Sequence, residues 1–155
     1  MLEPRFIPML LLAHGAMVKT VRFRDSNYVG DPINIVNIFS TLQADEVMVV
    51  DIEAAVGRRG PDYPLLRQIA SEAQVPFGYG GGIGTVEDVR EVLAAGVEKV
   101  VVSTAAVENP GLITAAADLA GSQAIVTTPA QKSRSQYERG APFTRIFRPA
   151  GSLGS

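Results

Sequence analysis

The sequence contains no cysteine, and only one of its 155 residues is a histidine. The absence of cysteine excludes disulfide bridges, thiolate metal sites and a cysteine nucleophile. No apolar run reaches the roughly 20 residues of a membrane-spanning helix, and the first residues show no signal-peptide pattern. We therefore expect a cytoplasmic protein with no membrane or nucleic-acid partner, and the sequence suggests no metal site and no cofactor.

Hydrophobic residues make up 46% of the chain, which is enough for the core of one domain of ordinary size. The net charge of −2 is the sum of an acidic part and a basic part of the chain. Residues 1–126 contain nine Lys or Arg and fifteen Asp or Glu, whereas residues 127–155 contain five and one. The later segment is also rich in Ser, Pro, Gly and Gln. We expect residues 1–126 to form the folded domain. Residues 127–155 are expected to be an irregular basic tail, either disordered or the product of a frameshift or truncation.

Apolar runs typical of buried strands alternate with apolar residues at helical spacing. Strands are expected at residues 5–12, 17–23, 46–51, 75–79 and 97–102 and from residue 123. Helices are expected to begin near Asp31, Leu65, Thr85 and Asn109. Residues 24–30 and 52–61 are expected to be loops. This repetition indicates right-handed parallel βαβ units. Two architectures fit it, an open doubly wound sheet and a (βα)8 barrel. Four units and the start of a fifth strand are half of a barrel of about 250 residues.

Glycines and hydroxyl residues follow two of the expected strands, at the end where parallel α/β folds bind ligands. Gly80, Gly81 and Gly82 are consecutive, so the backbone there can approach an anion closely, and a phosphate is the usual one. Ser103 and Thr104 follow the next strand and would add hydroxyl donors. The alternative is ordinary turn chemistry at both strand ends. We interpret Gly81, Gly82, Ser103 and Thr104 as a candidate phosphate site.

Charged residues lie near both ends of the expected strands. Asp51 ends an apolar strand, and a carboxylate in that place requires a partner or a ligand. Asp51 and Lys19 are candidate catalytic residues, and the lone His14 is expected to be exposed in a loop. The other set lies at the strand starts and comprises Arg5, Glu46 and Lys99. On the residues alone, a surface salt-bridge network is the better interpretation of that set.

Several runs of sequence resemble the cyclase subunit of imidazole glycerol phosphate synthase. They are VKT at 18–20, GDPI at 30–33, YGGGI at 79–83, VEKVVVSTAAVENPGLI at 97–113 and GSQAIV at 121–126. The resemblance covers about residues 1–126. Within that family, LLL at 10–12 and GDPINIVNIF at 30–39 look most like a paralogous branch found with sugar-modifying amidotransferase systems of surface-polysaccharide synthesis.

The resemblance implies a fold, a reaction and a partner. The family is a (βα)8 barrel of histidine biosynthesis, and a glutaminase subunit supplies it with ammonia at the bottom of the barrel. The ammonia reacts with a phosphorylated ribotide, giving imidazole glycerol phosphate and an aminoimidazole carboxamide ribotide. The resemblance assigns Gly82, Ser103 and Thr104 to a phosphate site, and Lys19 and Asp51 to the substrate mouth. It also changes the interpretation of Arg5, Glu46 and Lys99 from a salt bridge to an ammonia gate, and it assigns Glu98 to the partner interface.

The sequence also departs from the family pattern. Leu11 stands where the family has its first catalytic aspartate, and leucine cannot transfer a proton. The second aspartate should follow the fifth strand, where this chain reads Thr127-Thr128-Pro129-Ala130, and Ser103 stands where the family usually has asparagine. Catalysis by these residues alone is therefore not expected.

Three hypotheses remain open on the sequence. The first is an impaired piece of a cyclase subunit. The second is a fragment of the paralogous ammonia-using subunit that serves sugar amidation. The third is a non-catalytic half-barrel that binds phosphate or a partner. The exposed strand edges of a half-barrel also favour a homodimer.

Overall fold

The computed structural model of the chain describes residues 3–21, 25–57, 59–128 and 148–149. The strands are β1 (Met9–Ala13), β2 (Ala16–Val21), β3 (Asp25–Gly30), β4 (Val47–Asp51), β5 (Phe77–Gly80), β6 (Lys99–Val102), β7 (Ile125–Thr127) and β8 (Arg148–Pro149). The helices are α1 (Pro32–Thr41), α2 (Ile52–Val56), α3 (Tyr63–Glu72), α4 (Val86–Ala94), α5 (Thr104–Glu108) and α6 (Pro110–Ala120), with a 3-10 turn at Ser122–Ala124.

All of these strands belong to one sheet, in the order β3-β2-β1-β4-β5-β6-β7-β8. The pairs β1–β4, β4–β5, β5–β6 and β6–β7 are parallel. The pairs β1–β2, β2–β3 and β7–β8 are antiparallel. The parallel part therefore contains neighbouring βαβ units, as the strand and helix alternation of the sequence predicts.

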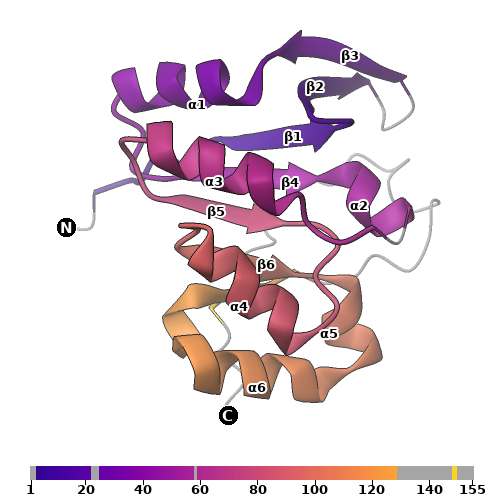
Figure 1. Cartoon of the computed structure of the whole chain (residues 1–155). Helices are drawn as coiled ribbons and strands as arrows, with labels where there is room; N and C mark the ends of the chain where they lie inside the picture. The colour runs from indigo at the N-terminus through magenta and orange to yellow at the C-terminus, as the bar shows by residue number, and fades with distance from the viewer. Residues whose placement is uncertain (1–2, 22–24, 58, 129–147, 150–155) are drawn as a thin grey trace.

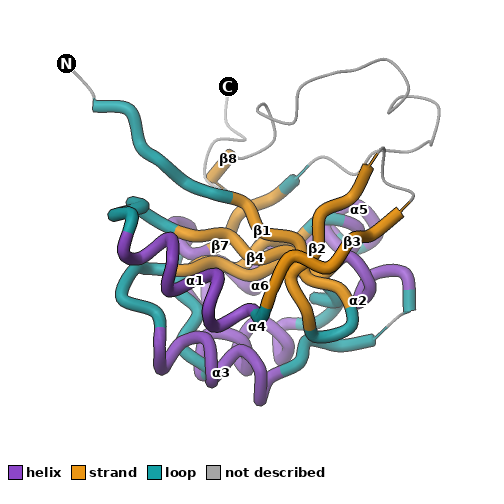
Figure 2. The backbone as a smooth tube through the Cα atoms, turned by 90° about the horizontal axis from the view of Figure 1, so that it is seen from above, coloured by secondary structure: helices purple, strands orange, loops and turns teal. Residues whose placement is uncertain are grey.

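The longer helices α1, α3, α4 and α6 cover one face of this sheet, as Figures 1 and 2 show for α1 and α3. Alternate strand residues, such as Leu12, Val49, Tyr79 and Val100, pack under the helices in the main core. The intervening residues form a second, smaller cluster on the opposite face, made of Met48, Val101 and Val126 with Met9 against it. Helices on one face and a small apolar layer on the other are the arrangement of half a (βα)8 barrel, which confirms the predicted fold.

Local sequence signals account for most helix starts. Asp31 caps α1, and its carboxylate accepts hydrogen bonds from the N–H groups of Ile33 and Asn34 at 3.0 and 3.1 Å. Thr85 caps α4 in a reciprocal capping box with Asp88. Proline occupies the first turn of α1, α3 and α6, where its missing N–H costs nothing. None of the helices in the described part of the chain is long and apolar enough to cross a membrane.

Three expectations about local structure are wrong. Residues 25–30 form β3 rather than a loop, because their backbone pairs with β2, although residues 26–29 are exposed. The segment after Asp51 contains the short helix α2, which the side chain of Asp51 caps. The first strand begins at Met9 rather than Arg5, so Pro8 lies just before the ladder and removes no hydrogen bond from it.

The predicted tail lies largely outside the described residues. Within it, Thr127 still belongs to β7, and Arg148–Pro149 form the short strand β8. β8 pairs antiparallel with β7, with Val126 opposite Pro149 and Thr127 opposite Arg148. This edge of the sheet is therefore partly paired, and the unpaired edge expected after β7 is not fully open.

Candidate functional site

The glycine turn after β5 has a backbone conformation that other residues rarely adopt. Gly81 and Gly82 have φ values of 124° and 70°. A Cβ on Gly81 would lie 2.5 Å from the carbonyl oxygen of Asp51, and a Cβ on Gly82 would collide with the carbonyl oxygen of Arg59. Only glycine therefore lets this turn lie against the end of β4 and the segment at Arg59.

The end of the glycine turn is fixed by a hydrogen-bond network at the start of α4. Oδ2 of Asp88 accepts hydrogen bonds from the backbone N–H groups of Gly84 and Thr85, both at 2.9 Å. The Tyr63 hydroxyl donates to Oδ1 of Asp88 at 3.1 Å and joins α3 to α4. Burial, followed by the charge of Asp88, raises the pKa of Tyr63 to about 12. The glycine turn is thus fixed at its start by the backbone contacts of Gly81 and Gly82 and at its end by Asp88.

Ser103 and Thr104 lie at the end of β6, next to the strand that leads into the glycine turn. Gly80 pairs with Val101 in the β5–β6 ladder, so the two loops leave the same edge of the sheet. Ser103 is partly buried and makes no capping hydrogen bond to α5, and Thr104 is exposed. The structure thus puts the four residues of the candidate phosphate site on two adjacent strand ends.

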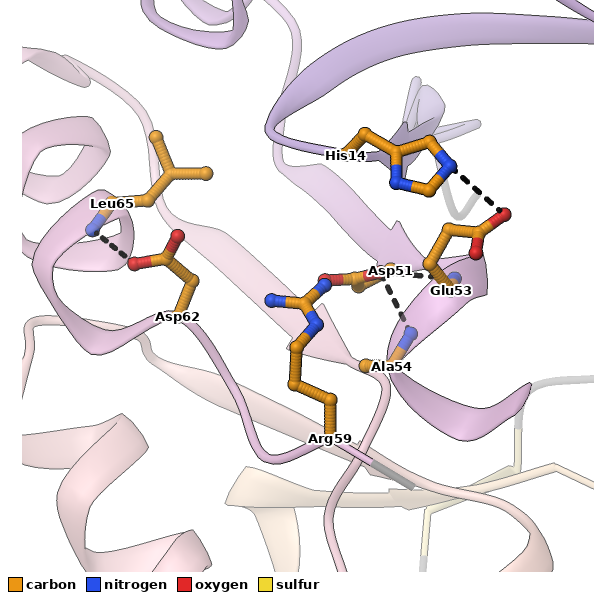
Figure 3. Close-up of polar contacts among 7 residues, drawn as sticks. All are labelled: His14, Asp51, Glu53, Ala54, Arg59, Asp62 and Leu65. Carbon is orange, nitrogen blue, oxygen red and sulfur yellow. Dashed lines mark hydrogen bonds and ion pairs between the residues drawn. The ribbon is translucent and has the colours of Figure 1, made fainter. Parts of the chain in front are cut away.

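Asp51 is buried, and both of its carboxylate oxygens are occupied. Oδ1 accepts from the N–H groups of Glu53 and Ala54, each at 3.0 Å, and thereby caps α2. Oδ2 lies 3.0 Å from a guanidinium nitrogen of Arg59. Figure 3 shows the Arg59 side chain reaching across to this carboxylate. In this structure Asp51 serves as a helix cap and an ion-pair partner.

The other residues that the sequence singled out near the substrate mouth lie on β1, β2 and the turn between them. His14, at φ 50°, lies in that turn, with Nε2 3.7 Å from Oε1 of Glu53. Lys19 is exposed on β2. Leu11 is partly buried and pairs with Val18 and Val50 in the two adjacent ladders. It shares with Lys19 a mainly apolar cavity of about 350 Å³ between β1, β2, β3 and α1.

Glu46 contacts both of the other charged residues expected at the strand starts, Arg5 and Lys99. Glu46 is 2% exposed, and its Oε2 accepts from Nζ of Lys99 at 2.8 Å and from Arg5 at 3.4 Å. Its Oε1 is buried and has no hydrogen-bond partner among the described residues. A buried carboxylate with one unmatched oxygen differs from the surface salt bridge that the residues alone suggested.

Glu98 lies near this lower end of the sheet. It is exposed, and its N–H donates to the carbonyl of Phe77 at 3.0 Å. It lines a cavity of about 230 Å³ together with residues at the end of α3 and the start of β5. Its position is therefore available to an approaching molecule.

Three contributors to the site were not predicted from sequence. Arg59 appeared only as part of a loop, although its pairing with Asp51 is central to the geometry. Tyr63 carries no local pattern that would reveal its bond to Asp88, 25 residues away. Tyr79 is buried and its hydroxyl has no partner in the described structure. Burial and then the charge of Asp51 raise the pKa of Tyr79.

The fold and these strand-end groups define a class of protein, namely half of a (βα)8 barrel with candidate ligand groups at both ends of its parallel strands. Residues 5–136 match the profile of a family described as "Histidine biosynthesis protein". The match covers most of the chain, so the chain belongs to the histidine biosynthesis protein family.

Individual relatives agree with this assignment. The chain is 46% identical over 126 residues to "Putative imidazole glycerol phosphate synthase subunit HisF" of Leptospira interrogans, covering 81% of this chain and 50% of the relative. It is 49% identical over 126 residues to a hisF3 subunit, similarly named, of Vibrio vulnificus, covering 81% and 48%. It is 40% identical over 151 residues to imidazole glycerol phosphate synthase subunit HisF of Syntrophobacter fumaroxidans, covering 97% and 55%. The chain spans about half the length of the curated relatives it matches.

Proposed function

We propose that the chain is the amino-terminal half of an ammonia-using cyclase subunit of the imidazole glycerol phosphate synthase type. In such a subunit, ammonia from a glutaminase partner enters at the strand starts and reacts with a phosphorylated ribotide at the strand ends. Family membership and the names of the relatives support this proposal. The single observation that carries it is the buried Glu46 network at the amino ends of the strands.

The chemistry of Glu46 suits a gate for ammonia. Lys99 and Arg5 both bind Oε2, and Oε1 is left as a buried acceptor without a donor among the described residues. A buried acceptor of this kind is costly while it lacks a donor, and ammonia is a small donor that can bond to it. Lys99 and Arg5 are 33% and 58% exposed, so their side chains can move outward and open a passage.

The opposite end of the sheet suits a phosphate group. Backbone N–H groups of the Gly81–Gly82 turn and the hydroxyls of Ser103 and Thr104 are donors on adjacent strand ends. Donors of this kind, fixed before the ligand arrives, are the usual means of holding a phosphate. Lys19 is an exposed cation that the resemblance assigns to the same mouth. We assign substrate binding to these residues and docking of the glutaminase partner to the face that contains Glu98.

Leu11 favours a second candidate function. The resemblance puts the first proton-transferring aspartate of the family at this position, and Leu11 lies in a largely apolar cavity. General acid–base catalysis typically contributes about 100-fold to 10,000-fold to a rate. A subunit that lacks this group fits the paralogous branch, which would deliver ammonia to a sugar substrate and not close an imidazole ring.

The proposal is tested by rebuilding a barrel. The chain is co-expressed with a carboxyl-terminal part of the Syntrophobacter fumaroxidans relative that begins before its fifth strand, so that this part supplies the family's second aspartate, which the chain lacks at residues 127–130. The complex is assayed with ammonium and the ribotide. We expect Leu11→Asp to raise cyclisation by about 100-fold or more over the native chain. Leu11→Asn is the matched control, because it is polar and of similar size but cannot transfer a proton. Equal rates for the two variants, or no turnover with Leu11→Asp in a well-folded complex, would count against a cyclase. Rescue of a histidine auxotroph by the native complex would exclude the sugar-amidating alternative.

A further inference from the structure

Asp51 and Arg59 flank the glycine turn from two sides. Asp51 ends β4, and Arg59 lies eight residues later, after the short helix α2. Their side chains form an ion pair with a 3.0 Å contact. We call this pair, together with the backbone of the two residues, the Asp51–Arg59 clamp.

The backbone of the clamp is in direct contact with the turn. The carbonyl of Asp51 lies against the α-carbon of Gly81, where an added Cβ would be only 2.5 Å from it. The carbonyl of Arg59 lies against Gly82 in the same way. The N–H of Arg59 also donates to the carbonyl of Ala54 at 3.0 Å, which ties the second side of the clamp to α2. A shift of the Arg59 backbone would therefore change the position of Gly82.

The ion pair is the only side-chain link between the two sides of the clamp among the hydrogen bonds and ion pairs of the described residues. Its carboxylate is 1% exposed and its guanidinium side chain is 47% exposed. Tyr79 is buried nearby, and the Asp51 charge contributes to raising its pKa. Because the carboxylate is shielded from water, its pairing with Arg59 is less screened than an ordinary surface contact.

We infer that Asp51 and Arg59 are positioning residues, whose ion pair sets the conformation of the Gly81–Gly82 turn and thereby its affinity for an anionic group. This inference rests on the proposed phosphate site. The role is geometric, because the clamp contributes a carboxylate as well as a guanidinium and is electrically neutral as a unit. A carboxylate close to an anion site would by itself weaken anion binding.

Substitutions on both sides of the clamp test this role, and Asp51→Asn separates geometry from charge. Asp51→Asn removes a negative charge and keeps a side-chain oxygen that can cap α2, since asparagine is a good N-cap. Electrostatics alone would then strengthen anion binding, whereas loss of the clamp would weaken it. Arg59→Gln removes the clamp from the other side, and Arg59→Lys keeps a cation that can reach Asp51. Arg90→Gln is the matched control, because it breaks an exposed 2.8 Å ion pair with Glu87 on α4.

The test measures two quantities on the full chain. Inorganic phosphate is titrated in NMR experiments that follow the amide signals of Gly81 and Gly82. Hydrogen exchange of the same two amides is measured without phosphate, with Gly96 as a reference glycine that also has a positive φ. For Asp51→Asn and Arg59→Gln we expect an affinity lower by about fivefold or more, the low end of usual coupling between sites, and faster exchange at the turn. Arg59→Lys should recover part of both effects, and Arg90→Gln should change neither.

The outcomes distinguish the inference from the proposed function. Unchanged exchange at Gly81 and Gly82 in both clamp variants overturns the clamp. Tighter phosphate binding in Asp51→Asn overturns the geometric role. A native chain that shows clamp-dependent exchange but does not bind phosphate refutes the phosphate site and the claim on affinity, while the clamp itself stands.

Discussion

Replacing Lys99 by methionine should destabilise the fold far more than replacing Arg5. Both cations bind Oε2 of Glu46, which is 2% exposed. The Lys99 contact is 2.8 Å and its side chain is 33% exposed, whereas the Arg5 contact is 3.4 Å and its side chain is 58% exposed. Lys99 therefore provides most of the compensation for burying the Glu46 carboxylate.

The size of the effect follows from this burial. Removing one partner of a buried ion pair costs about 3–5 kcal/mol. We expect the low end, about 3 kcal/mol, for Lys99→Met, because Arg5 remains and Lys99 is partly solvated. Arg5→Met should cost about 1 kcal/mol or less, as an exposed pair does. In the double variant Glu46→Met/Lys99→Met, no uncompensated buried charge is left, because the remaining Arg5 side chain is 58% exposed, and most of the stability should return.

Urea unfolding followed by circular dichroism measures these differences. With a slope of about 1–3 kcal/mol per molar urea, the Lys99→Met midpoint should fall by about 1–3 M. The comparison requires a single cooperative transition with an unchanged slope in all variants. A Lys99→Met cost no greater than that of Arg5→Met, or a double variant no more stable than Lys99→Met, would refute the view that Glu46 is a buried charge held by Lys99.

Two further predictions concern the glycine turn and its support. Gly82→Ala should cost about 2 kcal/mol or more, since a side chain at φ 70° is strained and its Cβ meets the Arg59 carbonyl. Gly60→Ala, which has open space around it, is the control and should be nearly neutral in the same urea assay. Tyr63 has its pKa raised from 10.0 to about 12 in the fold. Its stabilising contribution should therefore be complete below pH 10 and be lost as the pH rises to about 12. The stability difference between native chain and Tyr63→Phe should shift in favour of phenylalanine over that interval, and a pH-independent difference would contradict the assignment.

The elements that sequence predicted well are those with strong local signals. Continuous apolar runs predicted β4 and β6. Asp31-Pro32 and Thr85 predicted the starts of α1 and α4. β3 was missed because the exposed side chains of Ser26, Asn27, Tyr28 and Val29 show no alternation of polar and apolar residues. α2 was missed because a five-residue helix offers no periodicity, although Asp51 as an N-cap and Glu53 in the first turn are helix-start signals.

The candidate site was predictable in location but not in its contacts. Parallel topology alone brings Gly82 and Ser103 to one edge of the sheet and Glu46 and Lys99 to the other. Pairings between distant residues, such as Tyr63 with Asp88, depend on how helices pack and leave no trace in local sequence. Asp51 shows the limit most clearly. Its position at a strand end was recognised, but whether its carboxylate faces a ligand or a helix depends on side-chain direction.

The direction of the Asp51 side chain also indicates what chemistry this half of a barrel can perform. Leu12 pairs with Asp51 in the β1–β4 ladder, and Leu12 belongs to the core beneath the helices. Asp51 therefore lies on the helix side of the sheet, and the residues beside these two that face the other way are Leu11 and Val50. The inner face at the ends of β1 and β4 is thus apolar. A proton donor for a substrate held there would have to come from outside these two strands. The Leu11→Asp substitution would add a carboxylate on the inner face of β1, opposite Val50 of β4.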